Sequence, residues 1–270
     1  MENRMTQKIA LITGGSRGLG ASAAQHLAQS NTGIIITYHN QKTAAEKVVK
    51  SINDNGGHAA ALQLDTTVTT SFTSFKNSLT ETLQNVFSRD GFDYLINNAG
   101  YGLFKPFADT TEAELDQMYQ VHFKGPFLLT QCLSNMIASG GRILNVSSGL
   151  TRMTFAGYDA YAAMKGAVEV MTRYQAASFA QRSIAVNTLA PGAIETDFGG
   201  GVVRDNSELN QQIAANTAMG RVGLPDDIGQ AIAGLLVATS GWMTGQRIEV
   251  SGGQGLQKIF SCLKNLASKR

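Results

Sequence analysis

A tyrosine, a lysine and a serine in this chain have the spacing of a proton-transfer site. Lys165 follows Tyr161 by four positions, and residues four apart on a helix share a face, so the ammonium can lie beside the phenol. A fixed cation in that place stabilises the phenolate and lowers the pKa of the phenol. Ser148 stands thirteen positions before the tyrosine, at the end of the apolar run Ile143–Ser148, which is typical of a buried strand. We therefore expect the three side chains to meet at the carboxyl end of that strand.

The amino-terminal segment has the pattern of a phosphate-binding turn. The apolar run Lys8–Thr13 leads into a glycine-rich stretch and then into an alanine-rich helix. Gly14 and Gly18 suit backbone conformations or close approaches that a β-carbon would block, and free N–H groups at a helix start attract a pyrophosphate. The match Gly18-x-Gly20-x-x-Ala23 is incidental, because it begins too far beyond the strand. The residues predicted to bind a dinucleotide in this turn are Gly14, Ser16, Arg17, Gly18, Leu19 and Gly20.

Several further segments follow one another in a fixed order. Asp65 comes after an apolar run, Asn97–Gly100 follows a strand-like run, and Pro191 and Gly192 come soon after Asn187. With the glycine-rich turn and the serine, tyrosine and lysine, these segments resemble the short-chain dehydrogenase/reductase family over nearly the whole chain. The remaining segments that carry the resemblance are Ile194, Thr196, Gly220–Pro225 and Ser251–Gly253.

Strand-like runs alternate with helical patterns almost throughout, as repeated strand–helix–strand units require. We predict one α/β domain over residues 1–256, a Rossmann-like, doubly wound parallel sheet of about seven strands with helices on both faces. Strands are expected near 8–13, 33–38, 60–64, 93–97, 142–147, 183–189 and 246–250. Helices are expected near 18–29, 41–54, 70–87, 112–138, 158–181 and 225–238.

Composition excludes several other classes of protein. The chain has 270 residues, of which 43% are hydrophobic and 16% charged, as in one large globular domain. A net charge of +2 without a basic stripe argues against a nucleic-acid partner. The two cysteines form no metal-ligand or disulfide pattern, so no metal site is predicted. No apolar run is long enough for a bilayer and the first eight residues lack a signal-peptide core, so we expect no membrane partner and a cytoplasmic location.

Residues 257–270 form a carboxyl-terminal extension beyond the usual end of the family. Ile259, Leu263 and Leu266 share a helical stripe, so the extension either packs on a neighbouring subunit or is a frayed end. The resemblance implies a homotetramer, with a homodimer as the alternative.

The preferred cofactor is predicted to be NADP(H). The second strand ends in Thr37–Lys42 without an Asp or Glu, the residue type that would hold the ribose of NAD and repel a 2′-phosphate. Arg17 can attract that phosphate with help from the nearby His39, Asn40 and Lys42. The alternative is that Arg17 and Lys42 are only solvated surface cations. Asn97 and Asn98 either flank the cofactor or serve only sheet and turn hydrogen bonds. The other cofactor contacts implied by resemblance are Asp65, Thr66, Asn98, Ala99, Gly100, Tyr161, Lys165, Pro191, Gly192, Ile194 and Thr196.

The resemblance implies a reversible reduction of a small-molecule carbonyl to an alcohol. Tyr161 would act as general acid, Ser148 would position the carbonyl oxygen, and Lys165 would hold the ribose hydroxyls and lower the phenol's pKa. Ser147 is the competing serine, and the family's spacing favours Ser148. Two alternatives are a 3-oxoacyl-thioester reductase that serves acyl carrier protein and a dinucleotide-binding sensor without turnover.

One position departs from the family's pattern. Where the family usually has an asparagine that holds a water next to the lysine, this chain has His122, within Gln120–Gly125. Its imidazole either takes part in a proton relay toward Lys165 or is a buried core histidine.

The stretch 198–216 begins with three glycines and continues with polar residues, which is poor core material. We interpret it as a flap over the substrate, with an ordinary surface loop as the alternative. Tyr158 and Tyr174 have no lysine four residues later and are expected to pack or to line the pocket. An apolar lining is predicted from Tyr101, Leu150, Phe155 and Phe198.

Overall fold

A computed structural model describes residues 7–237 and 241–256, so the predictions for the 257–270 extension lie outside the described residues. The described chain forms a parallel sheet of seven strands in the order β3-β2-β1-β4-β5-β6-β7, which confirms the predicted Rossmann-like fold. The strands are β1 (Ile9–Ile12), β2 (Gly33–Tyr38), β3 (Ala59–Gln63), β4 (Phe92–Asn97), β5 (Ile137–Val146), β6 (Ala185–Pro191) and β7 (Arg247–Val250).

The apolar strands alternate their side chains between two cores, one on each face of the sheet. Ile9 and Leu11 belong to one core, whereas Ala10 and Ile12 belong to the other, and all four are fully buried. A strand that buries both faces needs a continuous apolar run rather than an alternating pattern. That requirement explains why short runs of Ile, Leu and Val were sufficient to predict the strands.

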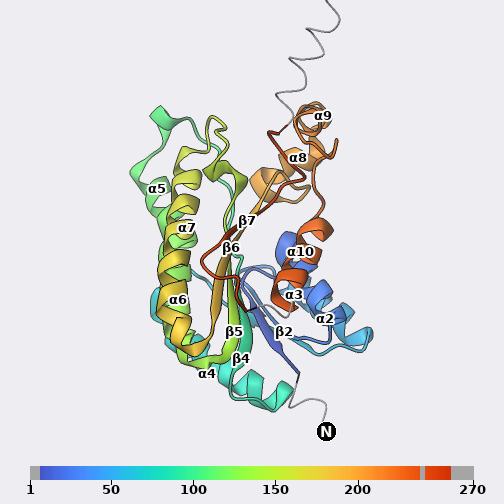
Figure 1. Cartoon of the computed structure of the whole chain (residues 1–270), viewed down its shortest axis with the longest axis vertical. Coiled ribbons are helices and arrows are strands. Elements are labelled where there is room, and N and C mark those ends of the chain that lie inside the picture. The colour runs from blue at the N-terminus through green and yellow to red at the C-terminus, as the bar shows by residue number, and fades with distance from the viewer. Residues whose placement is uncertain (1–6, 238–240, 257–270) are drawn as a thin grey trace, which may run out of the picture.

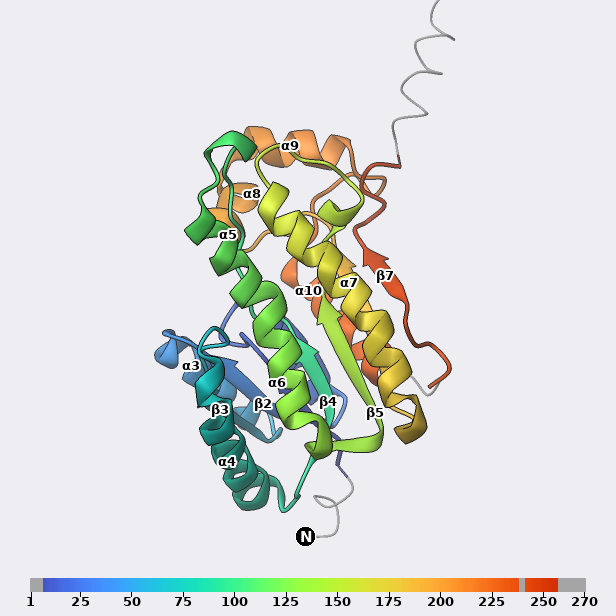
Figure 2. The ribbon, with the colours of Figure 1, turned by 90° about the vertical axis from the view of Figure 1, so that its left-hand side faces the viewer.

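Helices cover both faces of this sheet (Figure 1). One face is covered by α2 (Gly18–Gln29), α3 (Lys42–Asp54) and α10 (Pro225–Val237). The other is covered by α4 (Phe72–Thr82), α5 (Glu112–Tyr119), α6 (Gly125–Leu133) and α7 (Asp159–Phe179). Two short helices, α8 (Val202–Asp205) and α9 (Ser207–Ala215), lie beyond the end toward which the arrows of β5 and β7 point (Figure 2). None of the helices in the described ranges is long and apolar enough to cross a membrane.

Two predicted helices are interrupted, and one of them ends early. The helix predicted over 112–138 contains a wide π-type turn at Gln120–Lys124 and finishes in a short 3-10 turn, Ser134–Met136. Strand β5 then begins at Ile137, five residues before the predicted start, and its pairing with β4 shifts register between Phe92 and Tyr94. Gly140, at φ 76°, allows this irregular entry. The helix predicted over 70–87 likewise consists of a 3-10 turn, α4 and the π-type turn Leu83–Phe87.

The order of the strands reverses between β1 and β4, so the connections that follow these two strands diverge and leave a crevice at their carboxyl ends. The Thr13 hydroxyl, just after β1, accepts hydrogen bonds from the backbone N–H groups of Asn98 and Ala99, each at 3.0 Å. The segments that follow β1 and β4 are thereby tied together, and the predicted dinucleotide site lies beside them.

A buried carboxylate stabilises the opposite, amino-terminal edge of the sheet. Asp93 is 1% exposed and accepts from Lys8 Nζ at 2.8 Å, the Ile9 N–H at 2.9 Å and Arg89 Nη2 at 3.3 Å. Removing one partner of a buried ion pair leaves the remaining charges uncompensated.

We expect Asp93→Asn to lower the free energy of unfolding by about 3 kcal/mol in urea denaturation. The matched control is Asp54→Asn, because Asp54 pairs with Lys50 on the exposed face of α3, and its loss should change the free energy by less than about 1 kcal/mol. Equal effects of the two substitutions would contradict the assignment of Asp93 as a structural charge.

Candidate active site

Helix α7 and the end of β5 bring the three predicted chemical side chains together. Tyr161 and Lys165 project from α7, and each residue is only 5% exposed. Ser148 follows β5, and its hydroxyl is close enough to the Tyr161 phenol to lower the pKa of the phenol through hydrogen bonding. Lys165 Nζ lies 5.7 Å from the centre of the Tyr161 ring. The serine, tyrosine and lysine therefore meet at the carboxyl end of β5, as their spacing predicts.

The two neighbouring serines have different hydrogen-bond partners. The Ser147 hydroxyl lies within hydrogen-bond distance of the Glu169 carboxylate at 2.9 Å and of the Lys165 carbonyl at 3.3 Å. The Ser148 oxygen accepts from the Leu150 N–H at 3.2 Å, so its own proton is free for the phenol or for a ligand. This difference in partners supports Ser148 over Ser147 as the serine that can contact a substrate.

Burial dominates the proton equilibria of this site. It raises the pKa of Tyr161 above its ordinary value, although the hydrogen bond from Ser148 acts in the opposite direction. Burial lowers the pKa of Lys165 to about 8. The predicted lowering of the Tyr161 pKa by Lys165 is not what the structure shows, because the ammonium is turned away and donates to the Val146 carbonyl at 2.8 Å. In this arrangement Tyr161 keeps its proton at neutral pH.

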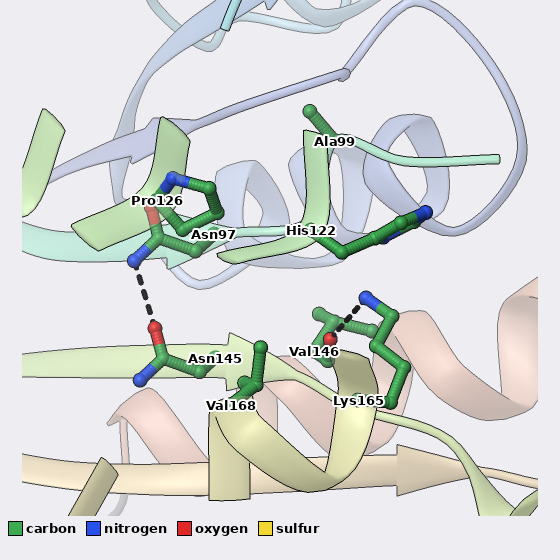
Figure 3. Close-up of a pocket in the computed structure, with 8 residues that line it drawn as sticks. All are labelled: Asn97, Ala99, His122, Pro126, Asn145, Val146, Lys165 and Val168. Carbon is green, nitrogen blue, oxygen red and sulfur yellow. Dashed lines mark hydrogen bonds between the residues drawn. The ribbon is translucent and has the colours of Figure 1, made fainter. Parts of the chain in front are cut away.

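A small cavity of about 10 Å³ lies beside Lys165. Asn97 and His122 line it together with the lysine, whose ammonium points toward the His122 side (Figure 3). Asn97 Oδ1 and His122 Nδ1 are the two buried side-chain polar atoms without a hydrogen-bond partner in the described part of the chain. A polar space of this size suits about one water molecule.

His122 lies on the wide turn Gln120–Lys124, which re-aims side chains between α5 and α6. Its Nε2 is 2.8 Å from the Tyr101 carbonyl, so this nitrogen carries the proton and Nδ1 is an acceptor. The ring meets that of Tyr161 edge-on, with centres 5.1 Å apart. Burial and, to a smaller extent, the charge of Lys165 lower the pKa of His122 well below its usual value. His122 is thus a neutral, buried histidine that also adjoins the predicted catalytic side chains.

The glycine-rich turn has the shape that a dinucleotide phosphate requires. A β-carbon on Gly14 would come within 2.8 Å of the Ala99 Cα, and one on Gly20 would come within 2.5 Å of the Gly14 carbonyl oxygen. Gly14 and Gly18 both adopt positive φ, at 66° and 55°. Arg17, the residue before α2, makes no side-chain capping bond, and the first turn of α2 carries no acidic residue. These features fit a bound pyrophosphate at the helix start.

The other predicted cofactor residues surround the same crevice, and some already have partners. The Asn98 amide donates to the carbonyls of Thr13 and Gly14 at 2.9 and 3.1 Å, so it braces the turn. Asp65 accepts from the Thr67 hydroxyl at 2.7 Å and contacts His39 at 3.2 Å. Of the rest, Ser16, Leu19, Gly192, Ile194 and Thr196 are half-buried, Thr66 and Pro191 are buried, and Asn40 is exposed.

Arg17, the predicted phosphate ligand, contacts the segment beyond β6. Its Nη1 lies 3.3 Å from a carboxylate oxygen of Asp197, which also accepts from Arg204 Nη1 at 2.7 Å. The neighbouring Thr196 methyl lies 3.6 Å from the place of a β-carbon on Gly18. Residues after β6 therefore lie beside the glycine-rich turn. Thr196 is predicted to contact the cofactor there.

An aromatic rim surrounds Tyr161. The ring of Phe198 lies edge-on to it with centres 5.3 Å apart, and the Tyr158 ring lies at 6.3 Å. Phe104 packs on Tyr158 at 5.5 Å. Of the predicted lining residues, Leu150 is half-buried beside Ser148, Phe155 is 51% exposed, and Tyr101 contacts His122. Tyr174 is 74% exposed.

The stretch predicted as a flap or surface loop is mostly helical. It contains a 3-10 turn at Phe198–Gly201 followed by α8 and α9, and the three glycines adopt φ of 61°, 76° and 82°. Phe198 carries the start of this segment onto Tyr161, so the segment covers the site. Its mobility stays a prediction.

Sequence reasoning did not single out two charged residues that contact the serine segment. Glu169 follows Lys165 by one helical turn, which was an available signal, and it accepts from Ser147. Arg247 begins β7 and donates to the Ser148 carbonyl at 3.3 Å. No local pattern marks Arg247, because its partners lie far away in the sequence.

Comparisons with known proteins identify the family of the chain. A family model described as enoyl-(acyl carrier protein) reductase matches residues 14–254. An uncharacterized oxidoreductase of Methylorubrum extorquens is 32% identical over 251 residues, which are 93% of this chain and 99% of the relative.

Solved structures of two ketoreductases have the same fold. The promiscuous reductase LugOII, which catalyses keto-reduction at C1 during lugdunomycin biosynthesis, has a TM-score of 0.88 and 36% identity over 94% of this chain and 99% of its own. The angucycline C-6 ketoreductase LanV with bound NADP has a TM-score of 0.87 and 31% identity over 94% of this chain and 97% of its own. On this evidence the chain belongs to the short-chain dehydrogenase/reductase family of oxidoreductases.

Proposed function

We propose that this protein is an NADP(H)-dependent carbonyl reductase in which Ser148, Tyr161 and Lys165 carry the chemistry. The observation that supports this most is that the Ser148 hydroxyl, the buried, protonated phenol of Tyr161 and the Lys165 side chain meet at the carboxyl end of β5. Two O–H donors from different elements then converge at one point, beside the ammonium of Lys165. Such a pair of donors suits an oxygen that gains negative charge during reduction.

The chain's residues have distinct roles in the proposed reduction. When bound, the reduced nicotinamide supplies the hydride for the carbonyl carbon. Ser148 positions the carbonyl oxygen, and Tyr161 donates the proton that converts the oxygen to a hydroxyl. The raised pKa of Tyr161 keeps the phenol protonated at neutral pH, so its proton is present for transfer. Lys165 is largely cationic there, with a pKa of about 8, and would hold the ribose hydroxyls of the bound nicotinamide nucleotide.

A relay can return the proton to Tyr161. Lys165 reaches the small polar cavity, and His122 Nδ1 and Asn97 Oδ1 are acceptors on its walls. After the Lys165 ammonium gives a proton to the Tyr161 phenolate, one water in this cavity can pass a proton from solvent to the neutral amine. In this proposal His122 takes the role of the asparagine that the family usually has at this position. Its neutral imidazole accepts a hydrogen bond from the water.

The residues around β2 support NADP(H) over NAD(H). No carboxylate stands between Thr37 and Lys42 to repel a 2′-phosphate. Arg17 lies on the surface at the glycine-rich turn, and its ion pair with Asp197 is exposed, with side chains 61% and 45% accessible. An exposed pair is weak, so the guanidinium can exchange this partner for a phosphate. The NADP bound to LanV lends support from a relative.

The aromatic rim supports a flat, ring-containing ketone as the substrate. Phe198, Tyr158 and Phe104 offer ring faces and edges around the Tyr161 phenol, and aromatic pairs prefer such stacked and edge-on contacts. The two solved ketoreductases compared above are described as acting at C1 during lugdunomycin biosynthesis and at C-6 of an angucycline. A 3-oxoacyl thioester is the second candidate, because the description of the matching family model names acyl carrier protein.

The main test combines a substrate panel with Tyr161→Phe. We expect turnover of bicyclic aromatic ketones in the NADPH absorbance assay, and slower turnover of an acetoacetyl thioester. Tyr161→Phe keeps the ring but removes the proton, so kcat should fall by about a thousandfold while NADPH binding stays intact. Tyr174→Phe, on the exposed face of α7, is the matched control and should retain activity. Near-normal turnover by Tyr161→Phe would overturn the mechanism, and a faster reaction with the thioester would reverse the order of substrates.

Cofactor choice is tested by the ratio of kcat/KM with NADPH to kcat/KM with NADH. We expect a marked preference for NADPH, and we expect Arg17→Ala to reduce the preference by about ten- to hundredfold through the loss of a charge-assisted hydrogen bond. Rates with NADH should not change. Lys50→Ala, which removes an exposed cation on α3, should leave the ratio as it is. Equal values with the two cofactors in the unaltered protein would refute the assignment.

The pH dependence should report Lys165. Its pKa is about 8, so its charge is present below that pH and lost above it, whereas Tyr161 keeps its proton throughout. We expect kcat/KM for NADPH to fall above pH 8 by up to about tenfold per pH unit. His122→Phe removes the Nδ1 acceptor, and it should lower kcat by about tenfold and alter the pH profile of kcat if the relay operates. An unchanged profile in this variant would argue that His122 is only a core residue.

A further inference from the structure

A buried ion pair lies behind the catalytic serine, on the face of α7 that carries Tyr161 and Lys165. Glu169 is one turn beyond Lys165, and its side chain is 16% exposed. One carboxylate oxygen accepts from Arg247 Nε at 2.7 Å, the Thr151 hydroxyl at 2.7 Å and the Ser147 hydroxyl at 2.9 Å. We call these four residues the Glu169 cluster.

The cluster also holds the backbone of Ser148. Arg247, whose side chain is 9% exposed, donates from Nη2 to the Ser148 carbonyl at 3.3 Å and to the Thr151 hydroxyl at 3.2 Å. The Thr151 hydroxyl lies 3.0 Å from the same Ser148 carbonyl. These bonds fix the Ser148 carbonyl and the residues Ser147 and Thr151 on either side of it. The Ser148 hydroxyl takes no part in them and is free to interact with Tyr161.

Three separate elements are joined by this cluster. Glu169 comes from α7, Arg247 from the edge strand β7, and Ser147 and Thr151 from the turn after β5. Helix α7 lies over the strands β5 and β6, with β7 beside them (Figure 2). Ser148 and Tyr161 belong to different elements, so their hydrogen bond requires that the turn and the helix keep a fixed separation. Catalytic groups lose efficiency when displaced by about 1 Å.

We propose that Glu169 and Arg247 are positioning residues that hold the Ser148 hydroxyl against the Tyr161 phenol. This inference rests on the proposed function of Ser148 and Tyr161. A buried charge pair is costly to desolvate, and packed apolar side chains could join the same elements. The directed hydrogen bonds of the pair instead fix the serine backbone in one orientation.

A double-mutant cycle tests whether Glu169 acts through Ser148. Glu169→Gln keeps the shape of the side chain but removes one of the two carboxylates that hold Arg247, and the other, Glu249, accepts from Arg247 Nη1 at 2.8 Å. We expect it to lower kcat for ketone reduction by about 10- to 100-fold, with little change in KM for NADPH. In a Ser148→Ala background the same substitution should cost less than about threefold, because the group being positioned is already gone. A fully additive loss would overturn the proposal.

A milder variant guards against a failure to fold. Thr151→Val removes only the hydroxyl that links Glu169 to the Ser148 carbonyl, and it should also lower kcat and show the same non-additivity with Ser148→Ala. Arg247→Lys should retain more activity than Arg247→Met, since it keeps a cation.

The control is Asp93→Asn, which removes a buried charge at the opposite edge of the sheet and should reduce stability without a selective loss of kcat.

Crystal structures give a readout that does not depend on activity. In Glu169→Gln or Thr151→Val, we expect the Ser148 hydroxyl to move out of hydrogen-bond distance of Tyr161. An unmoved serine would refute the positioning role whether or not a ketone is turned over. If the unaltered protein reduces no ketone, the proposed function fails, and the position of Ser148 in these variants still decides the structural claim.

Discussion

The hydrogen bond between Ser148 and Tyr161 is the contact on which the proposed chemistry depends. It joins a turn after β5 to the helix α7, and it is formed where both residues are nearly excluded from solvent. Low water content strengthens such a bond and at the same time holds the phenol in its protonated form. The same environment brings the ammonium of Lys165 toward neutrality. Burial therefore keeps the proton on the tyrosine at neutral pH.

Polar contacts in the core fix the rotation of α7 and so the direction of Tyr161. The side-chain amide of Asn145, on β5, donates to two side chains of α7. These are the Thr172 hydroxyl and the side-chain oxygen Oε1 of Gln175, both at 2.9 Å. Asn97 on β4 donates in turn to the Asn145 side-chain oxygen at 2.8 Å. Buried polar groups need such partners, so a rotated helix would leave several of them unsatisfied. This network and the Glu169 cluster together restrain α7 along its length.

Local patterns in the sequence were sufficient for most of the fold. Apolar runs predicted the seven strands, and helix α2 has the predicted bounds, because glycine marks its start. Periodicity could not reveal the wide turn that aims His122, since one extra residue in a helix leaves the apolar pattern almost intact. It also placed the start of β5 too late, because Gly140 and Gly141 interrupt that strand. Arg247 and Glu169 are 78 positions apart, so only the folded chain brings them together.

The contact between Phe198 and Tyr161 has a consequence for the kinetics of the enzyme. A substrate carbonyl needs the space beside the phenol that this ring now borders, and the glycines that follow Phe198 adopt backbone conformations that side chains disfavour. A shift of the ring from Tyr161 onto the ketone would then accompany each binding event, and the reverse shift would accompany escape of the alcohol. For a fast ketone, the rate of turnover would be set by this displacement and not by hydride transfer.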